Sequence, residues 1–433
     1  MKKTLLFASV IAALPIVASA QAVETDSLSN ALPSGNSAVP DRAVVLTGGE
    51  NGVRQELLDE LYSESNHTFN DPSAPRFLLL DKQGNTIFGI GGQIEGVVRY
   101  DFGGAQESDG FNVMNIAVPA NPARRERFSA DATRSSLVFH LLRNTRLGVL
   151  SGYVHADFSG QNYGFKLRQA YIRLHNVTAG LAISTFQDVM ATPSSIDYNG
   201  PVGQVDHKTM QLQYRVNYAN GLGWGIAAEL PPFGATYGPQ TEAISQRVPD
   251  LPAYIQYQWA GGKSHIRASA MLRNLSYRDL ATASNRFATG YGVQLSGVVK
   301  IVPQLTALAQ ATYGRGITSY MESTMSSTYD LIPAASADGH LNPTPSFGFV
   351  GGLKYKPLPN FFVSTNYSML RLYGTETVGP DAFHRGNYAA VNAFYNPLDE
   401  LQVGIEYIHG RYKIADGQSA TANRIELMVK YSF

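Results

Sequence analysis

The sequence predicts an all-β fold, a sixteen-stranded antiparallel transmembrane β-barrel with a short N-terminal periplasmic extension. Apolar and polar residues alternate along segments of roughly ten to fifteen residues, longer than the five or six of an average soluble strand and long enough for a tilted membrane strand. Short and long connections alternate between these segments. Aromatic residues and glycine are abundant, with 24 Tyr, 20 Phe and 41 Gly, whereas only 16% of residues are charged.

The first twenty residues have the features of a signal peptide. Lys2 and Lys3 supply a positive start, and residues 4–17 form an apolar stretch that is too short to span a bilayer. Residues 18–20, Ala-Ser-Ala, form a small-residue cleavage site. We therefore expect residues 1–20 to direct export, and the remaining chain to reach the outer membrane of a Gram-negative envelope.

Residues 21–85 are expected to form a periplasmic segment that is partly flexible, because residues 22–51 are rich in Ser, Pro, Gly and Asn. A short helix is predicted near 53–64, where one face carries Val53, Leu57, Leu58 and Leu61. This segment holds fewer than two heptads, whereas a coiled coil needs three or four. Packing against a neighbouring surface and a contribution to a coiled coil both remain open.

The barrel is expected to occupy residues 86–433. Its first strand, 86–102, shows apolar residues or glycine at every even position from Phe88 to Phe102, with polar residues between several of them. A soluble sandwich would alternate in the same way, so the number, length and linkers of the strands decide. The other fifteen strands are predicted near 131–142, 147–158, 164–175, 178–186, 208–218, 222–231, 251–260, 263–277, 287–301, 304–316, 345–356, 360–372, 385–396, 400–413 and 422–433.

The connections after even-numbered strands are tight, whereas those after odd-numbered strands include the long segments 103–130, 187–207, 232–250 and 317–344. Short periplasmic turns and long outer loops are typical of outer-membrane barrels. The even count of strands places both ends of the barrel in the periplasm. Closure is expected because lipid offers no hydrogen-bond partner to an open sheet edge.

The last strand suits the closing position. Its outward face is apolar, its inward face carries charge, and it ends on Tyr431 and Phe433. This aromatic end resembles the terminal strand that the outer-membrane assembly machinery recognises, so we expect Tyr431 and Phe433 to act as the assembly signal. Other aromatic residues gather near strand ends, as expected for two girdles in contact with outer-membrane lipids.

Composition and motifs exclude several function classes. With 34 basic and 34 acidic residues the chain lacks the charge of a nucleic-acid binder, and it has no cysteine. No zinc-protease motif, nucleophile elbow or P-loop is present. His140 and His155 fall on adjacent strands, but no third metal ligand is visible. We therefore expect no catalytic residues, no metal and no cofactor, with a barrel enzyme of lipase or protease type and a non-conducting structural or adhesive barrel as alternatives.

The inward faces carry the residues expected to line a pore. Among the residues that the alternation turns inward, we expect these to line the pore: Arg99, Arg134, Lys166, Arg168, Arg215, Arg267, Arg273, Arg424 and Glu95. The same alternation also turns four other acids inward, Asp157, Glu229, Glu406 and Glu426. Arginine forks bind carboxylates in pairs of hydrogen bonds, and rings of basic residues favour anions. We expect passive diffusion of small hydrophilic solutes with a preference for small anions. The alternative is that each arginine pairs with a lumen acid and only stabilises the wall.

A sixteen-stranded barrel needs a constriction to discriminate between solutes. The long loop 187–207 could provide it, and it carries Asp188, Asp197 and Asp206. In general porins a loop at this place folds into the lumen. The sequence leaves open whether the loop does so here or lies outside as a cap.

Three segments resemble the DcaP-type trimeric outer-membrane porins. They are Arg-Phe-Ser-Ala-Asp-Ala-Thr-Arg at 127–134, Phe-Lys-Leu-Arg-Gln-Ala-Tyr at 165–171 and Ser-Thr-Phe-Gln-Asp at 184–188. The resemblance covers about residues 86–433 and implies a homotrimer that passes small anions, notably dicarboxylates. It also implies that Arg134, Lys166 and Arg168 lie near the path. Those porins carry a longer periplasmic coiled coil, to which only residues 53–64 could correspond here.

Overall fold

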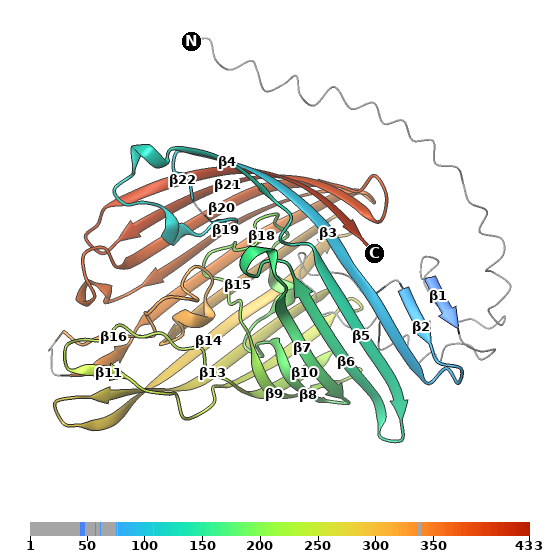
Figure 1. Ribbon diagram of the computed structural model, residues 1–433, viewed down its shortest axis with the longest axis horizontal. Helices are drawn as coiled ribbons and strands as arrows, with labels where there is room; N and C mark the ends of the chain where they lie inside the picture. The colour runs from blue at the N-terminus through green and yellow to red at the C-terminus, as the bar shows by residue number, and fades with distance from the viewer. Residues whose placement is uncertain are drawn as a thin grey trace, which may run out of the picture.

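The computed structural model describes residues 44–47, 57, 61, 75, 77–106, 108–335 and 339–433. The predicted signal peptide and most of the predicted periplasmic segment lie outside these residues. The described chain forms one closed antiparallel barrel of sixteen strands (Figure 1). No described helix is long and apolar enough to cross a membrane.

Alternate strands run in opposite directions around the barrel, as predicted. In chain order they are β3 (Thr86–Phe102), β4 (Glu126–Asp131) with β5 (Ser136–Thr145), β6 (Gly148–Asp157), β7 (Lys166–Leu174), β8 (Val177–Ile183), β9 (Lys208–Asn217), β10 (Leu222–Glu229), β12 (Leu251–Trp259), β13 (Ser264–Asp279), β14 (Ser284–Val302), β15 (Leu305–Arg315), β18 (Pro345–Leu358), β19 (Phe361–Leu372), β20 (Phe383–Tyr395), β21 (Leu401–Ile414) and β22 (Ser419–Ser432). The barrel closes where β22 pairs with β3.

The second strand differs from its prediction. It begins at Glu126 and not at residue 131, because β4 and β5 both pair with β3 and form one barrel strand. The strand is interrupted at residues 132–135, where β3 spans the gap with one residue fewer. This bulge takes Arg134 out of the regular ladder.

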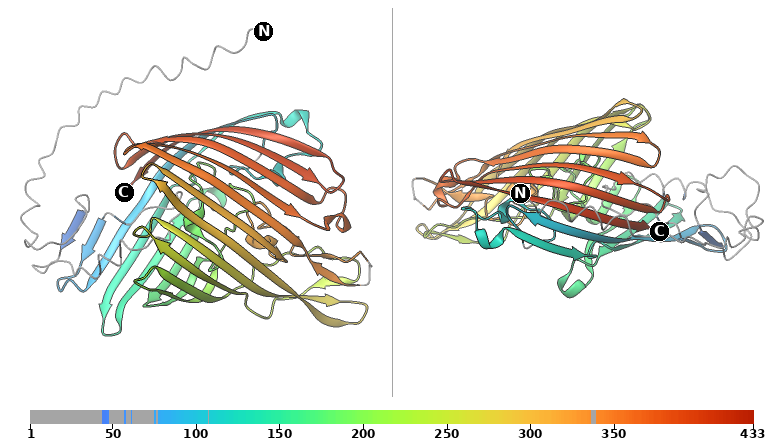
Figure 2. Two further views of the ribbon diagram at one scale, coloured as in Figure 1. Left: turned by 180° about the vertical axis from the view of Figure 1, so that it is seen from behind. Right: turned by 90° about the horizontal axis from the view of Figure 1, so that it is seen from above.

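The barrel has two unlike sides. On the short side, β6 to β10 and β12 are seven to ten residues long. On the long side, β13 to β22 and β3 provide barrel strands of eleven to nineteen residues. The hairpin of β13 and β14 extends well past the strands of the short side (Figure 2). The long side therefore carries the wall beyond the level at which the short side ends.

Side chains alternate across this wall as the sequence predicts. On β22, Leu427 and Val429 are exposed on the outer face, whereas Arg424 and Glu426 are fully buried on the inner face. Charge stays inside because a basic side chain at the bilayer midplane costs about 2–4 kcal/mol. Tyr431 is exposed near the periplasmic end of the same outer face.

A small sheet extends the wall at the periplasmic end. β22 reaches only Gln93 on β3, and β2 (Phe77–Leu80) pairs with the part of β3 that β22 leaves uncovered. β1 (Val44–Thr47) pairs in parallel with β2. In the predicted helix near 53–64 only Leu57 and Leu61 are described; both are helical and buried. They pack in a cluster with Leu78, Leu80, Ile87 and Leu142.

The outer loops contain the remaining short elements. These are β11 (Thr241–Ala243), β16 (Leu331–Pro333), β17 (Leu341–Pro343), and the 3-10 turns η2 (Val113–Asn115), η3 (Pro122–Arg124), η4 (Gln161–Tyr163), η5 (Val189–Ala191), η6 (Thr318–Tyr320) and η7 (Thr375–Thr377). β11 continues the sheet along the edge of β13 beyond the start of β12.

Candidate functional site

The loop between β8 and β9, residues 184–207, folds into the lumen, which settles the alternative that the sequence left open. We call it the constriction loop. It crosses to the long side, where His265 Nε2 lies 2.8 Å from the Asp188 carboxylate and Gln310 Nε2 donates to the carbonyl of Ala191 at 2.9 Å. These contacts hold the first half of the loop against β13 and β15.

Glu406 on β21 anchors the middle of the constriction loop. Its carboxylate accepts hydrogen bonds from the Ser195 hydroxyl at 2.8 Å and from the amides of Asp197 and Ile196 at 3.0 and 3.1 Å. Asn392 donates a further bond at 2.6 Å. The fully buried Glu406 carboxylate thus accepts hydrogen bonds from four donors. These bonds hold the constriction loop along the inner wall of the long side.

The three aspartates of this loop have different surroundings. Asp197 is fully buried and accepts from the amide of Phe111 at 2.8 Å, so it fixes one loop to another. Asp188 is also buried. Burial raises its pKa, but the hydrogen bond with His265 and the charge of Arg267 outweigh burial and leave the pKa lowered. Of the three, only Asp206 is half-exposed.

Two more outer loops fold inward over the long side. A buried apolar cluster joins them to the constriction loop and the wall: Phe111, Val113 and Ile116 come from the first outer loop, Phe186, Val202 and Val205 from the constriction loop, and Ile317, Tyr320 and Met321 from the loop before β18. Wall residues of β19 to β22 and Met271 of β13 complete it. The outer half of the lumen is therefore packed on the long side.

This packing seals three of the predicted pore arginines, which corrects the expectation that they line the path. Arg99 bonds Glu426 at 3.0 Å and also pairs with Asp131. Arg424 bonds Asp101 at 2.6 Å. Both arginine side chains have no exposed surface. They face inward as alternation requires, but loops cover them, and they stabilise the wall.

Arg273 is sealed in the same way on β13. Its guanidinium lies 2.9 Å from Asp250 and 3.3 Å from Asp330, with no exposed surface on any of the three side chains. Burial raises the pKa of Asp250 even though Arg273 opposes the shift. Glu95 is likewise buried, 3.5 Å from Arg134, and does not border the cavities described below.

The remaining basic residues border two cavities on the short side. The outer cavity has a volume of about 750 Å³ and is lined in part by Arg134, Lys166, Arg168 and Lys208. The outer ends of β7 and β9 supply three of them, since β7 starts at Lys166 and β9 at Lys208. The guanidinium of Arg134 donates to the carbonyl of Ile196 and is nearly buried.

Several side chains shape the outer cavity. Arg168 pairs with Asp157, and its guanidinium lies 4.8 Å from the centre of the Tyr198 ring. Glu322 also lines the cavity; burial and the nearby charge of Asp206 raise its pKa well above the usual range. Burial and the charge of Arg273 lower the pKa of His207, another lining residue, to about 4.

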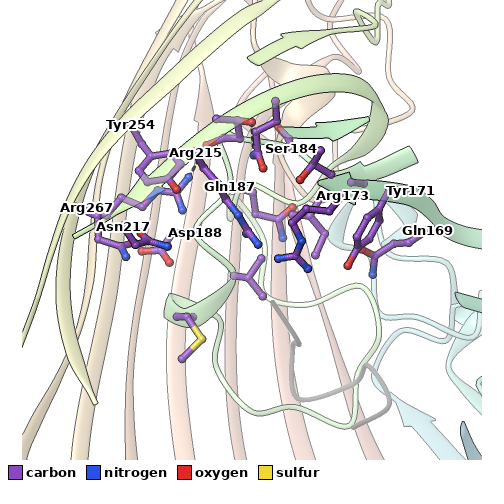
Figure 3. A pocket seen from close by; sticks show the side chains of 18 of the residues that line it. Gln169, Tyr171, Arg173, Ser184, Gln187, Asp188, Arg215, Asn217, Tyr254 and Arg267 are labelled. Carbon is purple, nitrogen blue, oxygen red and sulfur yellow. Dashed lines mark hydrogen bonds between the residues drawn. The ribbon is translucent and has the colours of Figure 1, made fainter. Parts of the chain in front are cut away.

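The inner cavity lies nearer the periplasm and measures about 110 Å³. Arg173, Arg215 and Arg267 line it together with Gln187 and Asp188 of the constriction loop (Figure 3). Arg267 stacks on a tyrosine ring of β12 at 3.7 Å, and its guanidinium also donates to a carbonyl of the constriction loop. Basic side chains thus border the constriction loop on both sides along the short wall.

The sequence did not predict Arg173 because of a bulge. β6 and β7 pair regularly from Leu174 to Gln169, and the register then shifts so that Leu167 faces Ala156. Counting alternation from Lys166 and Arg168 places Arg173 on the lipid face, but the bulge turns it inward. The sequence still held one signal for the inward orientation of Arg173. An arginine side chain that faces lipid near the bilayer midplane destabilises a barrel by about 2–4 kcal/mol.

The porin subfamily matches residues 81–430 of the chain. The chain belongs to this family. Three solved structures share the fold of this porin: the outer-membrane channel DcaP of Acinetobacter baumannii (TM-score 0.71, 22% identity, 81% of this chain and 99% of that chain), an anion-selective porin from Comamonas acidovorans (0.52, 11%, 80% and 100%) and OmpF of Salmonella typhi (0.51, 12%, 81% and 98%). No curated protein matches.

These comparisons confirm the predicted resemblance to DcaP-type porins and the outer-membrane location of this porin. At sequence identities of 11–22% these solved structures show the fold alone. The path through the barrel is therefore inferred from the residues of this chain.

Among the described residues no three His, Asp or Glu side chains gather in a way that could hold a metal. His140 lies 2.9 Å from the hydroxyl of Ser151.

Proposed function

We propose that this porin is a passive pore for small hydrophilic solutes and that it favours small anions, dicarboxylates among them. The main observation in support of this proposal is the set of basic side chains on β7, β9 and β13. They line the cavities on either side of the constriction loop. Lys166 and Arg215 make no ion pair with any described carboxylate. Their charge is therefore available to a passing solute.

The arrangement of acids supports the same sign. Asp188 is engaged by His265, Ser296 and the charge of Arg267, so its field is largely compensated. Asp206 remains half-exposed beside the outer cavity. Asp109 and Glu322 line the same cavity, and burial raises the pKa of Glu322 well above the usual range. The four cations of the cavity therefore outnumber its two charged acids, Asp109 and Asp206. Two unit charges 4 Å apart interact by about 4 kcal/mol at an effective dielectric of 20, so this excess of cations favours anions in a narrow path.

The proposed preference for dicarboxylates follows from the walls of the inner cavity. Arg173 comes from β7 and Arg267 from β13, on opposite sides of the space in Figure 3. A solute with a carboxylate at each end can meet a guanidinium at each wall, and such charge-assisted bonds are about twice as strong as neutral ones.

The proposal includes a homotrimer, which the resemblance to DcaP-type porins implies, and it excludes an enzymatic role. It also keeps Tyr431 and Phe433 as the signal for the outer-membrane assembly machinery. The exposed apolar outer face of the strands, for example Ile172, Leu212 and Ile226, would contact lipid or neighbouring subunits. Electrophoresis of unheated protein after chemical cross-linking tests the trimer.

A second candidate is a barrel that does not conduct at rest, and the buried apolar cluster of three loops favours it. Planar-bilayer recording separates the two. We expect stepwise increases in conductance as single pores open. In a KCl gradient the sign of the reversal potential should indicate a preference for anions. Succinate added to the dilute chamber should reduce this potential, because it competes with chloride for the basic side chains. Absence of conductance steps would support the closed barrel, and a cation-selective reversal potential would contradict the anion pore.

A further inference from the structure

Three basic side chains lie side by side on the outer face of the long side. Arg371 of β19 pairs directly with Arg385 of β20, and Arg385 pairs with Lys413 of β21. Each lies on the face that carries exposed apolar residues on its own strand, such as Tyr367, Val391 and Ile405. Arg411 lies two residues from Lys413 on the same face, so four cations gather there. We call these four residues the basic rim.

The position of the basic rim along the barrel axis follows from the pairing register of β19 and β20. The aromatic residues Phe361 and Tyr395 pair with each other near the periplasmic end, and each lies ten residues from the rim arginine of its strand. Ten residues rise about 33 Å along a strand, and a tilt of 35–45° reduces this to roughly 25 Å, the height of the apolar band of such barrels. The basic rim therefore lies at the level of the outer-leaflet headgroups.

The basic rim lacks a compensating carboxylate within the described chain. None of the four cations makes an ion pair with a described acid. Glu376 lies 4.0 Å from His384, and its side chain is 59% exposed. The Nε atoms of Arg371 and Arg385 are buried without a hydrogen-bond partner. Directly opposed like charges destabilise a sheet, so an outside anion would relieve this arrangement.

Other contacts position the rim without neutralising it. The guanidinium of Arg371 lies 4.6 Å from the centre of the Tyr373 ring. Arg411 donates to the hydroxyl of Ser419 at 3.0 Å. Tyr367 accepts from Asn387 just below the rim, at the level of the outer aromatic girdle. The arginines are thus held in place at the boundary between apolar band and headgroups.

We propose that the basic rim of Arg371, Arg385, Arg411 and Lys413 binds the phosphate groups of a phosphorylated glycolipid in the outer leaflet. Arginine forks match phosphate oxygens in geometry and charge. The phosphate groups of such a lipid would lie at the height of the rim. The acyl chains of the lipid would run along the apolar face below. The site is separate from the lumen, so it does not depend on the proposed pore function.

The experiment uses purified full-length porin in detergent and native mass spectrometry. The probes are diphosphorylated lipid A, the same lipid after removal of both phosphates, and inorganic phosphate. We expect diphosphorylated lipid A to bind at least about tenfold more tightly than the dephosphorylated lipid, a difference of about 1.4 kcal/mol, and inorganic phosphate not to displace it at equal concentration.

The variant R371Q/R385Q/K413Q should bind diphosphorylated lipid A only as well as wild type binds the dephosphorylated form. The control K263Q/K300Q/K356Q removes the same charge from exposed residues at the periplasmic end and should bind like wild type. Equal binding of the two lipids by wild type, which needs no variant, would overturn the proposal. So would unchanged binding by the rim variant, an equal loss in the control, or full displacement by inorganic phosphate.

Discussion

Arg215 on the short side and Arg424 on the long side are both inward-facing arginines of a membrane strand, yet the structure uses them differently. Arg215 borders the inner cavity. Arg424 has no exposed surface and is bound by Asp101 and by the carbonyls of Ser108 and Asp109. Strand alternation places both inside the barrel. The loops decide which one borders a cavity.

The difference arises from where the loops pack. On the long side the wall extends further, and three loops bury an apolar cluster against it. On the short side the strands end early, and the constriction loop leaves cavities lined by Lys166, Arg173 and Arg215. The same residue type therefore stabilises one wall and borders cavities along the other.

The largest effect is expected at the seam of the long side. The amide and carbonyl of Phe433 both bond Gly92, at 3.0 and 2.9 Å, and the ring lies 6.3 Å from Phe77. Deleting Phe433 removes these contacts and the aromatic end of the closing strand, so folded barrel in the outer membrane should fall to a small fraction of wild type. Heat-modifiable mobility on gels measures it, with Ser432→Ala as the control. Normal folded levels after deletion would contradict the prediction.

Removing a sealed cation should cost stability. Arg424→Ala leaves the Asp101 carboxylate buried without its ion-pair partner, whereas Glu426 keeps Arg99. Breaking a buried ion pair costs about 3–5 kcal/mol. Arg215→Ala, at a partly exposed site, should cost about 0.5 kcal/mol. Urea unfolding in lipid vesicles compares the two. If both variants lose the same stability, the distinction between sealed and cavity-lining arginines is wrong.

Releasing the constriction loop should widen the path. Glu406→Ala removes the acceptor of four donors, three of them on this loop, and each donor left buried costs about 1–3 kcal/mol. The loop should detach from β21, and single-channel conductance should rise. Ser364→Ala, which removes one hydroxyl contact to the loop carbonyl of Ser194, is the milder control. Unchanged conductance in Glu406→Ala would show that this anchor does not set the aperture.

The smallest effect concerns pH. His207 lines the outer cavity, and its pKa is lowered to about 4 by burial and by Arg273. It should therefore stay neutral between pH 8 and pH 5, whereas an ordinary histidine would gain charge. The change in reversal potential between these pH values should be the same for wild type and His207→Gln. A rise in anion preference at pH 5 that the variant abolishes would show that His207 titrates in this range.

Much of this architecture could be predicted from the sequence. Alternation and linker length are local signals, and they predicted the strands, the closure and the inward face of residues such as Arg99. They could not predict which inward residues the loops would cover, because contacts such as Glu406 with Ser195 join positions 211 residues apart. Alternation also failed at Arg173, where a single bulge inverts the facing of the strand.

We propose that the cavity-lining cations of the short side set the ion preference of the pore. The most direct test is the reversal potential in a KCl gradient for wild type, R173Q/R215Q and R278Q/R315Q. The last variant removes the same charge from the outer face, where Arg278 and Arg315 lie. We expect anion preference in wild type and in the outer-face control, and its loss or reversal in R173Q/R215Q. Unchanged selectivity in R173Q/R215Q, or an equal shift in the control, would show that these cations do not set the ion preference.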